Sequence, residues 1–273
     1  MACRRVTCLH LRRSGKVSSR LGEDRAEHGL PARVLREGGV KVLGIVTARG
    51  GSKGIPGKNL VSVAGRTLLE WTAASALGAQ RLTRVVLSTE DDAIAAAGRT
   101  YGLDVPFMRP AHLAQDQTPT LPVLQHVIET LAGQGQHFDA VFILQPTHPM
   151  RRASDIDGAI ERLEQTGADS VISFTPVGDA HPARMKWVDE AGQVHDPDFA
   201  ESFEGQRRQD LPPLLLREGS VYVTRTEVLM GQGSIKGKDC RAWIVPRERA
   251  CNIDEPFDLW LAGQLLSKEA GAS

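Results

Sequence analysis

The sequence predicts an α/β protein with a mainly parallel sheet that is covered by helices on both faces. From Lys41 onward, apolar runs of about five residues, rich in valine, isoleucine and leucine, alternate with segments of helical periodicity. Strands that are apolar throughout are typical of parallel sheets, because both of their faces are buried. The composition, 41% hydrophobic and 24% charged among 273 residues, is that of an ordinary globular protein with a large core.

The first part of this pattern alternates three predicted strands with three predicted helices. Short apolar runs with β-branched residues predict strands at 42–47 (VLGIVT), 84–88 (RVVLS) and 140–144 (AVFIL). Apolar residues at helical spacing predict helices at 67–79 and 118–131. The alanine-rich segment 91–101 is also predicted to be a helix, because its acidic residues fall in the first turn, where they stabilise the helix N-terminus.

The second part continues with a predicted helix at 154–164, for which Ser154 is the expected N-cap residue. A strand at 170–174 (SVISF) follows. Regular structure returns further on, in elements that share the same apolar or helical patterns: strands at 219–224 and 241–245, and a last helix starting near Pro256, a residue suited to the first helical turn.

Segment 177–216 interrupts the alternation, because it is rich in charges and proline and has little periodicity. We interpret it as an inserted subdomain or dimerisation arm, and a plain long loop is the alternative. Ligands of parallel α/β sheets bind at the carboxyl ends of the strands. Functional residues are therefore expected in the loops that follow Thr47, Ser88 and Leu144.

The charge balance argues against two classes of partner. The chain has 33 basic and 33 acidic residues, which disfavours a nucleic-acid binder with one broad basic face. No apolar run approaches the ~18 residues that a membrane span needs, so a soluble protein without a membrane partner is expected. The cysteines form no Cys-x-x-Cys pair, and we expect free thiols in the cytoplasm; they are Cys3, Cys8, Cys240 and Cys251.

Residues 1–40 differ from the rest, with nine basic and four acidic residues and no sustained apolar period. A signal peptide would need an apolar stretch after the arginines, and a transit peptide would be poor in acids. We interpret this segment as a disordered basic extension or an upstream start, with a partner-binding tail as the alternative. Residues 41–273 then form the folded domain.

The stretch RGGSKGIPGKN at 49–59 is the strongest functional signal in the sequence. Its four glycines allow backbone N–H groups to approach an anion, and Arg49, Lys53 and Lys58 add three cations. A polyphosphate needs this combination. The spacing fits neither a Walker A loop nor the Gly-x-Gly-x-x-Gly motif of dinucleotide-binding proteins. A flexible surface loop is the alternative interpretation.

The sequence TARGGSKGIPGKNL at 47–60 resembles the amino-terminal motif of the acylneuraminate cytidylyltransferase family, and the resemblance extends over about residues 41–266. It implies a three-layer, Rossmann-like nucleotidyltransferase fold with a small inserted dimerisation subdomain, and a homodimer. It further implies transfer of CMP from CTP to a nonulosonic acid with release of pyrophosphate. The implied nucleotide-binding residues are Arg49, Gly50, Gly51, Ser52, Lys53, Asn59, Ser88, Arg109, Thr118 and Thr120.

Two further segments resemble family motifs for the sugar acid. The stretch QPTHPMR at 145–151 places a histidine, His148, where relatives have serine, and REGSVY at 217–222 places Glu218 where many relatives have asparagine. A lone histidine of this kind is more often a loop residue than a catalyst. The implied substrate-binding residues are Gln145, Arg184, Arg207, Arg208 and Arg217.

The stretch NIDEPFDL at 252–259 resembles the family motif Asp-Ile-Asp, in which two carboxylates on one face of an extended segment hold Mg²⁺ against phosphates. Here Asp254 is present and Asn252 replaces the first aspartate, so the resemblance implies Mg²⁺ bound by Asp254 and Asn252. Asp258 is interpreted as a first-turn acid of the last helix. The implied catalytic set is Arg49, Lys58, Arg207, Arg208 and Asp254, and no side chain stands out as a general base.

Two alternatives to this function remain. The first is a nucleotidyltransferase of the same fold that uses another sugar acid, such as Kdo. The second is a nucleotide-binding protein without catalysis, which the replacements at Asn252 and Glu218 keep open.

Overall fold

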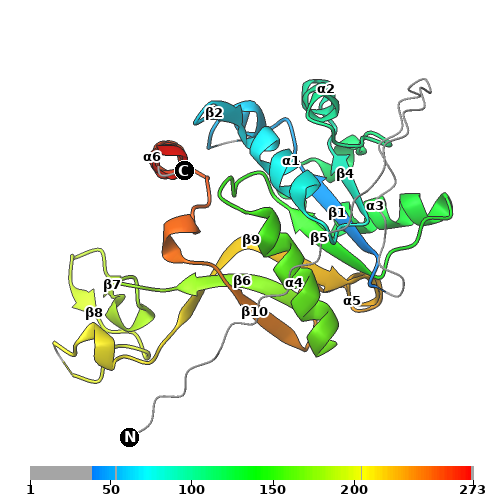
Figure 1. Cartoon of the computed structure of the whole chain (residues 1–273). Coiled ribbons are helices and arrows are strands. Elements are labelled where there is room, and N and C mark those ends of the chain that lie inside the picture. Colours follow the sequence, from blue (N-terminus) through cyan, green and yellow to red (C-terminus); the bar gives the residue numbers. More distant parts are fainter. Residues whose placement is uncertain (1–38, 53, 204, 272–273) are drawn as a thin grey trace, which may run out of the picture. The chain divides into compact units, whose positions relative to one another are not determined.

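The computed structural model describes residues 39–271 except Lys53 and Glu204. The basic extension expected for residues 1–40 therefore lies outside the described residues, apart from its last two positions. The main sheet has six strands in the order β10-β6-β9-β5-β1-β4 (Figure 1). Their bounds are Val42–Thr47 for β1, Arg84–Ser88 for β4, Ala140–Leu144 for β5, Ser170–Pro176 for β6, Leu215–Arg225 for β9 and Cys240–Ile244 for β10.

The sheet is mainly parallel, as the sequence predicted. Strand β1 pairs in parallel with both β4 and β5, and β10 pairs in parallel with β6. Strand β9 is the exception, because it lies antiparallel between β5 and β6. In the described part of the chain no α-helix connects β6 to β9; the chain returns through segment 177–214 instead and enters the sheet in the opposite direction.

The described residues contain six α-helices, and the helices that cover both faces of the sheet confirm the predicted α/β class (Figure 1). They are α1 (Leu68–Gly78), α2 (Asp92–Thr100), α3 (Thr120–Gly133), α4 (Ala153–Thr166), α5 (Thr226–Gly231) and α6 (Pro256–Gly271). Short strands form two further pairs: β2 (Ser62–Val63) with β3 (Arg66–Thr67), and β7 (Trp187–Val188) with β8 (Val194–His195).

Alternation along β1 creates two cores, one on each face of the sheet. Val42 and Val46 belong to a cluster with residues of α1, α2 and α4. Leu43 and Ile45 point to the other face and belong to a cluster with residues of α3 and α5. Successive strand residues face opposite sides, so a strand that is apolar throughout serves both clusters. A third cluster joins α6 to β2 and to the loop after β1.

Two helix starts differ from the prediction. Helix α4 begins at Ala153 and its N-cap residue is Arg152, so the assignment of Ser154 as the N-cap is wrong. The Asp155 carboxylate accepts the Arg152 backbone N–H at 3.0 Å and so satisfies the helix end from inside the first turn. Helix α3 begins at Thr120, two residues later than predicted, because Pro119 disfavours helical geometry at Thr118.

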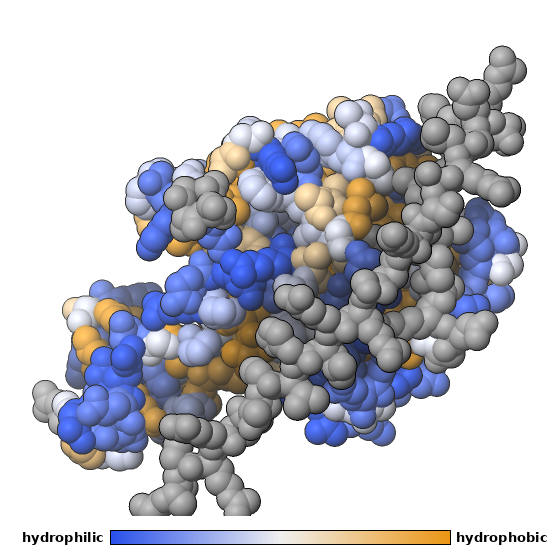
Figure 2. All heavy atoms as spheres, in the orientation of Figure 1, coloured by the Kyte–Doolittle hydropathy of each residue, from blue (hydrophilic) through white to orange (hydrophobic). Residues whose placement is uncertain are grey.

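Residues 177–214 are called the arm from here on. The arm contains the hairpin of β7 and β8, which lies outside the main sheet (Figure 1). Large apolar side chains are exposed on it, and Figure 2 shows this hydrophobic surface among polar residues. They are Met185, Trp187, Val188, Val194, Phe199, Phe203 and Leu214.

The expectations about membrane spans and cysteines can be compared with the described residues. Among the described helices none has the length and apolar character to cross a membrane. Cys240 and Cys251, the cysteines within the described residues, are free thiols. Burial raises the pKa of the Cys251 thiol to about 11.

Candidate active site

The carboxyl ends of three neighbouring strands meet at one edge of the sheet. Thr47 of β1 pairs with Ser88 of β4, and Val46 pairs with Leu144 of β5. The loops that follow these strands line a cavity of about 400 Å³, here called the first cavity. Its lining contains eleven residues predicted from the sequence: Arg49, Gly51, Ser52, Lys58, Asn59, Arg109, Thr118, Thr120, Gln145, Asn252 and Asp254.

The glycine-rich loop is held at its start by the end of β4. The backbone N–H of Gly50 donates to Glu90 Oε1 at 2.7 Å. A Cβ atom at position 50 would overlap the carboxylate of Asp91, which caps α2 by accepting the Ile94 N–H at 2.9 Å. Glycine at this position therefore allows the loop to pass close to the N-terminus of α2. Gly50 supports the loop rather than lining the cavity.

Two further residues of the loop are fixed by hydrogen bonds. The Asn59 side chain donates to the Arg49 carbonyl at 2.8 Å, which ties the two ends of the loop together. The Arg49 guanidinium donates to the Gln115 carbonyl at 3.0 Å and lies 3.3 Å from Asp116. Arg49 thus closes one side of the cavity. Lys53, the third cation of the predicted loop, lies outside the described residues.

Arg109 is a buried cation at the base of the first cavity. Its Nε donates to Ser88 Oγ at 3.0 Å, and its terminal N–H groups donate to the carbonyls of Ser88 and Ala48. Burial lowers the pKa of Arg109, and the nearby Glu90 carboxylate, 3.9 Å away, opposes this effect. Ser88 is itself buried and acts here as a support for Arg109.

The opposite wall of the cavity comes from the far end of the chain. Lys58 Nζ donates to the Ile253 carbonyl at 2.9 Å and to Asp254 Oδ1 at 3.0 Å. The Asn252 amide donates to the other carboxylate oxygen of Asp254. The Asp254 side chain is 63% exposed, whereas that of Lys58 is 14% exposed, so the carboxylate faces the opening.

Segment 247–254 is anchored on both sides. The Arg249 guanidinium forms a two-fold hydrogen-bonded pair with the Asp155 carboxylate of α4. The Asp258 carboxylate accepts the backbone N–H groups of Asp254 and Glu255 at 3.0 and 2.8 Å. Asp258 therefore caps the start of α6, as the sequence indicated, and these contacts position Asp254 at the cavity.

A second cavity of about 520 Å³ lies beside the first and shares Thr120 and Gln145 with it. Gln145 follows β5 directly, so its side chain stands where the two cavities join. The remaining walls combine apolar and aromatic side chains with two cations: Ile143, Ile172, Phe174, Tyr222, Ile235, Arg217 and Lys236.

The three predicted substrate-binding arginines of the arm line neither cavity in this chain. The Arg184 guanidinium donates to the Gln206 carbonyl at 3.4 Å. Arg207 pairs with Asp210 at 2.8 Å, and Arg208 pairs with Asp179 at 2.9 Å. All three side chains are exposed on the arm.

Sequence reasoning missed several residues that the structure brings to the site. Glu90, which follows β4, anchors the glycine-rich loop through the Gly50 N–H. Thr147 and Lys236 line the first and second cavities respectively. A hydroxyl residue directly after Gln145 and Pro146 was a usable signal for Thr147. Lys236 lies in a loop without periodicity, so nothing in the sequence marked it.

The donor set at Asp254 and Asn252 fits a divalent cation that also binds phosphate oxygens. No group of three or more histidine, cysteine or acidic side chains suitable for a metal occurs within residues 39–271, as far as these are described. A cation such as Mg²⁺ needs only one or two protein carboxylates when phosphates and water complete its shell. Asp254 supplies one carboxylate at the cavity opening, and the Asn252 amide adds an uncharged oxygen two residues earlier on the extended segment.

A mainly parallel sheet whose glycine-rich loop, cations and exposed carboxylate surround one cavity defines a nucleotide-binding α/β protein. Residues 43–232 match the family model described as "Cytidylyltransferase", and the chain belongs to this family. The chain is 31% identical to pseudaminic acid cytidylyltransferase of Campylobacter jejuni, over 82% of this chain and 95% of that protein. It is 28% identical to CMP-N,N'-diacetyllegionaminic acid synthase of Legionella pneumophila, over 83% and 97% respectively.

Among solved structures, the chain resembles that of CMP:2-keto-3-deoxy-manno-octonic acid synthetase complexed with CTP. The TM-score is 0.63 at 18% sequence identity, and the match covers 84% of this chain and 99% of the other. This likeness confirms the nucleotidyltransferase fold predicted from the sequence.

Proposed function

We propose that this cytidylyltransferase transfers CMP from CTP to the anomeric hydroxyl of a nonulosonic acid and releases pyrophosphate. The observation that carries the proposal is the junction of two cavities at Gln145. One cavity is lined by cations and the glycine-rich loop, and the other by apolar side chains with Arg217 and Lys236. The first suits a nucleoside triphosphate, and the second suits a carboxylated sugar with apolar substituents. The names of the relatives support the same pair of substrates.

The triphosphate would lie along the glycine-rich loop. Backbone N–H groups of the loop, with Arg49 and Lys58, neutralise charge that develops on the leaving pyrophosphate. Lys53 is assigned to the same role from its place in the loop. Arg109, Thr118 and Thr120 then contact the nucleoside part of CTP.

Mg²⁺ is the proposed cofactor, held by Asp254 with help from Asn252. When bound, the ion supplies a positive charge that draws the phosphate oxygens into position. The protein's own residues prepare this contact. Lys58 orients the Asp254 carboxylate, and Asp258 fixes the backbone that carries it. The transfer itself needs mainly positioning and charge stabilisation.

The sugar acid would occupy the second cavity, with Gln145 and Arg217 as its polar contacts. We further propose that the arm, which the sequence predicted as residues 177–216, mediates dimerisation and belongs to a domain of residues 41–273. The exposed apolar side chains of the arm favour burial against a second copy of the chain. Arg184, Arg207 and Arg208 would then reach the partner's sugar acid, where a guanidinium can bind a carboxylate with two hydrogen bonds.

Replacement of Lys58 or Asp254 by alanine tests this assignment. Each change is expected to cost ~2–4 kcal/mol of transition-state stabilisation, the scale for loss of one strong electrostatic contact. The measurement is pyrophosphate release from CTP with a panel of acids: N,N'-diacetyllegionaminic, pseudaminic, N-acetylneuraminic and Kdo. Wild-type rates in either variant would remove that residue from the site.

Lys268 is a matched control, since it is an exposed lysine on the last turn of α6. Its replacement by alanine should leave turnover unchanged. Activity of the wild-type protein with Kdo alone would favour the related sugar-acid enzyme, and CTP binding without turnover on any acid would favour a non-catalytic protein.

A further inference from the structure

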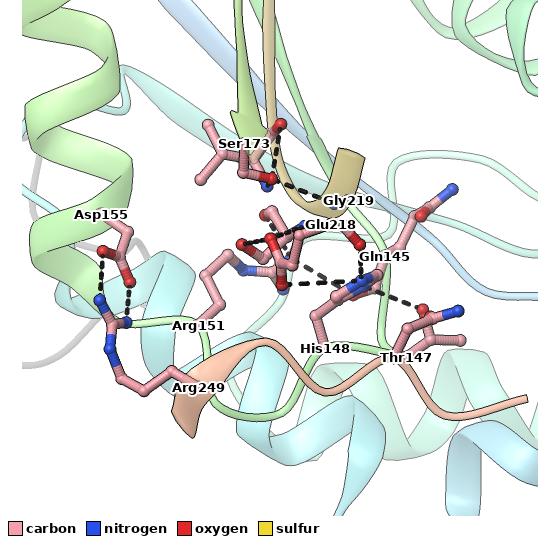
Figure 3. Close-up of polar contacts among 12 residues, drawn as sticks. Gln145, Thr147, His148, Arg151, Asp155, Ser173, Glu218, Gly219 and Arg249 are labelled. Carbon is pink, nitrogen blue, oxygen red and sulfur yellow. Dashed lines mark hydrogen bonds and ion pairs between the residues drawn. The ribbon is translucent and has the colours of Figure 1, made fainter. Parts of the chain in front are cut away.

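His148 is a buried residue between the first cavity and β9. It follows Thr147 in the turn after β5, and only 3% of its side chain is exposed (Figure 3). One ring nitrogen, Nδ1, lies 3.0 Å from Thr147 Oγ1, and the other, Nε2, lies 2.9 Å from the backbone carbonyl of Glu218. The ring thus connects a strand residue to a hydroxyl that lines the cavity.

These two contacts determine where the imidazole carries its proton. A backbone carbonyl can only accept a hydrogen bond, so Nε2 must carry a proton and donate it to Glu218. In the neutral ring Nδ1 then has a lone pair and accepts the Thr147 hydroxyl proton. Burial lowers the pKa of His148, which favours the neutral ring, and the buried Arg151 acts in the same direction while Glu218 and Asp254 oppose it.

The rest of the cluster holds His148 in this orientation. The Glu218 carboxylate accepts hydrogen bonds from the Ser220 N–H at 2.9 Å and the Ser220 hydroxyl at 2.6 Å, and its other oxygen, Oε1, lies 3.9 Å from His148 Nε2. A Cβ atom on Gly219, where φ is +100°, would lie 3.1 Å from Nε2. Glycine at 219 therefore leaves room for the ring to reach the carbonyl (Figure 3).

The hydrogen bond to His148 limits which kind of hydrogen bond the Thr147 hydroxyl can form with a ligand. Its single proton is committed to His148, so its oxygen can only accept a hydrogen bond from a ligand. Thr147 is two residues after Gln145, at the junction of the cavities, and its carbonyl accepts the Ile253 N–H at 2.9 Å, next to Asp254. Thr147 thus lies in the wall of the first cavity, close in sequence to Gln145, which lines both cavities, and bonded to the segment that carries Asp254.

We propose that Glu218 and His148 are positioning residues that fix the Thr147 hydroxyl as an acceptor for the attacking hydroxyl of the sugar acid. The proposal rests on the proposed function for the identity of that hydroxyl. No bond is made or broken by the three residues: Thr147 accepts the substrate O–H, and its own proton stays on the hydrogen bond to Nδ1. His148, one of the positions at which the chain departs from a family motif, thereby acts through the backbone carbonyl of Glu218 on one side and the Thr147 hydroxyl on the other.

The proton position can be tested without any substrate. In ¹⁵N spectra of the labelled full chain at neutral pH, the His148 signals are assigned as those missing from His148→Asn. A neutral ring protonated at Nε2 supports the proposal. A ring protonated at Nδ1, or at both nitrogens, overturns it. This readout does not depend on activity, so it separates the present proposal from a failure of the proposed function.

A double-mutant cycle tests the route through Thr147. Asn at 148 places a side-chain oxygen near the position of Nδ1 and can still accept the Thr147 proton, whereas His148→Ala removes the acceptor. We expect His148→Ala to lower kcat about tenfold with little change in the KM for CTP, and His148→Asn to recover most of it.

In the Thr147→Val background, which keeps the shape but lacks the hydroxyl, the His148→Ala change should have no further effect on kcat. Thr147→Ser, which retains the hydroxyl, should stay close to the wild type. An equal loss from His148→Ala in both backgrounds would show that His148 supports only the fold, and would overturn the proposal. CTP binding by calorimetry checks that every variant keeps a folded nucleotide site.

Discussion

Gly54 lies against the backbone of Asp254, and this contact brings the glycine-rich loop together with segment 247–254 at the site. A Cβ atom at position 54 would overlap the Asp254 carbonyl oxygen. The obstacle is backbone rather than a flexible side chain, so rotation cannot remove it. The glycine-rich loop and the proposed metal-binding segment can therefore approach each other only because residue 54 has no side chain.

Gly54→Ala should displace the segment that carries Asp254. We expect a loss of about 1–3 kcal/mol in the free energy of unfolding, as for other overpacked sites, together with a higher Mg²⁺ requirement. Urea unfolding and metal titration of turnover measure the two effects. Gly51→Ala is the matched control for stability, because a Cβ atom there meets nothing within 4 Å. Equal stability of the two variants would contradict the contact.

His148 should make stability depend on pH. Its pKa in the folded chain lies below the ordinary value of 6.5, with burial as the main cause. Between these two pKa values the unfolded chain binds more protons, so the free energy of unfolding falls as the pH drops below about 6.5. His148→Asn should flatten this dependence in urea unfolding between about pH 7.5 and about pH 5.5. An unaltered slope in His148→Asn would refute the assignment.

At the scale of elements, one buried ion pair ties the segment before Asp254 to α4. The Asp155 side chain is 5% exposed and that of Arg249 is 11% exposed. Burial alone would raise the pKa of Asp155, but hydrogen bonds from Arg249, the Arg152 N–H and Trp243 together lower it. The same carboxylate thus holds a helix N-terminus and a loop.

Asp155→Asn should destabilise the protein by about 3 kcal/mol, because it leaves the Arg249 cation buried without its partner. The exposed pair of Arg241 and Asp239 provides the control. Asp239→Asn should cost less than about 1 kcal/mol, as is usual for surface pairs. Similar unfolding free energies for the two variants would mean that the Asp155 pair does not hold the segment.

Whether a strand or helix could be predicted from the sequence depends on whether burial or a specific side-chain contact determines it. Three strands were predicted with the observed bounds, because a strand buried on both faces must be apolar throughout. The antiparallel direction of β9 could not be predicted, since an apolar run has the same pattern in either direction. The start of α4 depends on the Asp155 carboxylate inside the helix. Ser154, a residue type that favours N-cap positions, led to a predicted start that is later than the observed one.

The site was predictable to the extent that it follows the ends of these strands. Loops after Thr47 and Leu144 do line one cavity, and Lys58 does meet Asp254 across 196 positions of sequence. The role of Glu90 depends on a backbone N–H forty residues earlier, which no side-chain pattern reveals. The partners of His148 depend likewise on the register of β9.

At the scale of the whole molecule, the proposed dimer would let the arm of one subunit supply arginines to the active site of the other. Arg207 and Arg208 are exposed and pair only with acidic residues of their own surroundings in the described structure. If they serve the partner's site, two inactive variants should complement each other. Co-expression of Lys58→Ala with the double variant Arg207→Ala and Arg208→Ala should restore about a quarter of the wild-type sites, because half of the dimers are mixed and each of these has one intact site.

Differently tagged subunits allow the mixed dimers to be purified and their turnover measured. Each variant alone serves as the control and should remain at its low rate. Mixed dimers that form but show no recovery would place the arginines outside the partner's site. A chain that stays monomeric by sedimentation would instead refute the dimerisation arm itself.

Strand β9 carries a consequence for how such a protein can diverge or be redesigned. It leaves the arm at Leu215 and continues to Arg225, with a shift in its register against β6 between Arg217 and Tyr222, and it supplies both of these residues to the second cavity. If only the side chains of the second cavity were exchanged with those of a relative, they would stand on a strand whose first residues are still positioned by the original arm. Transplanting the arm together with its outgoing strand is therefore the natural unit of exchange between relatives that use different acids.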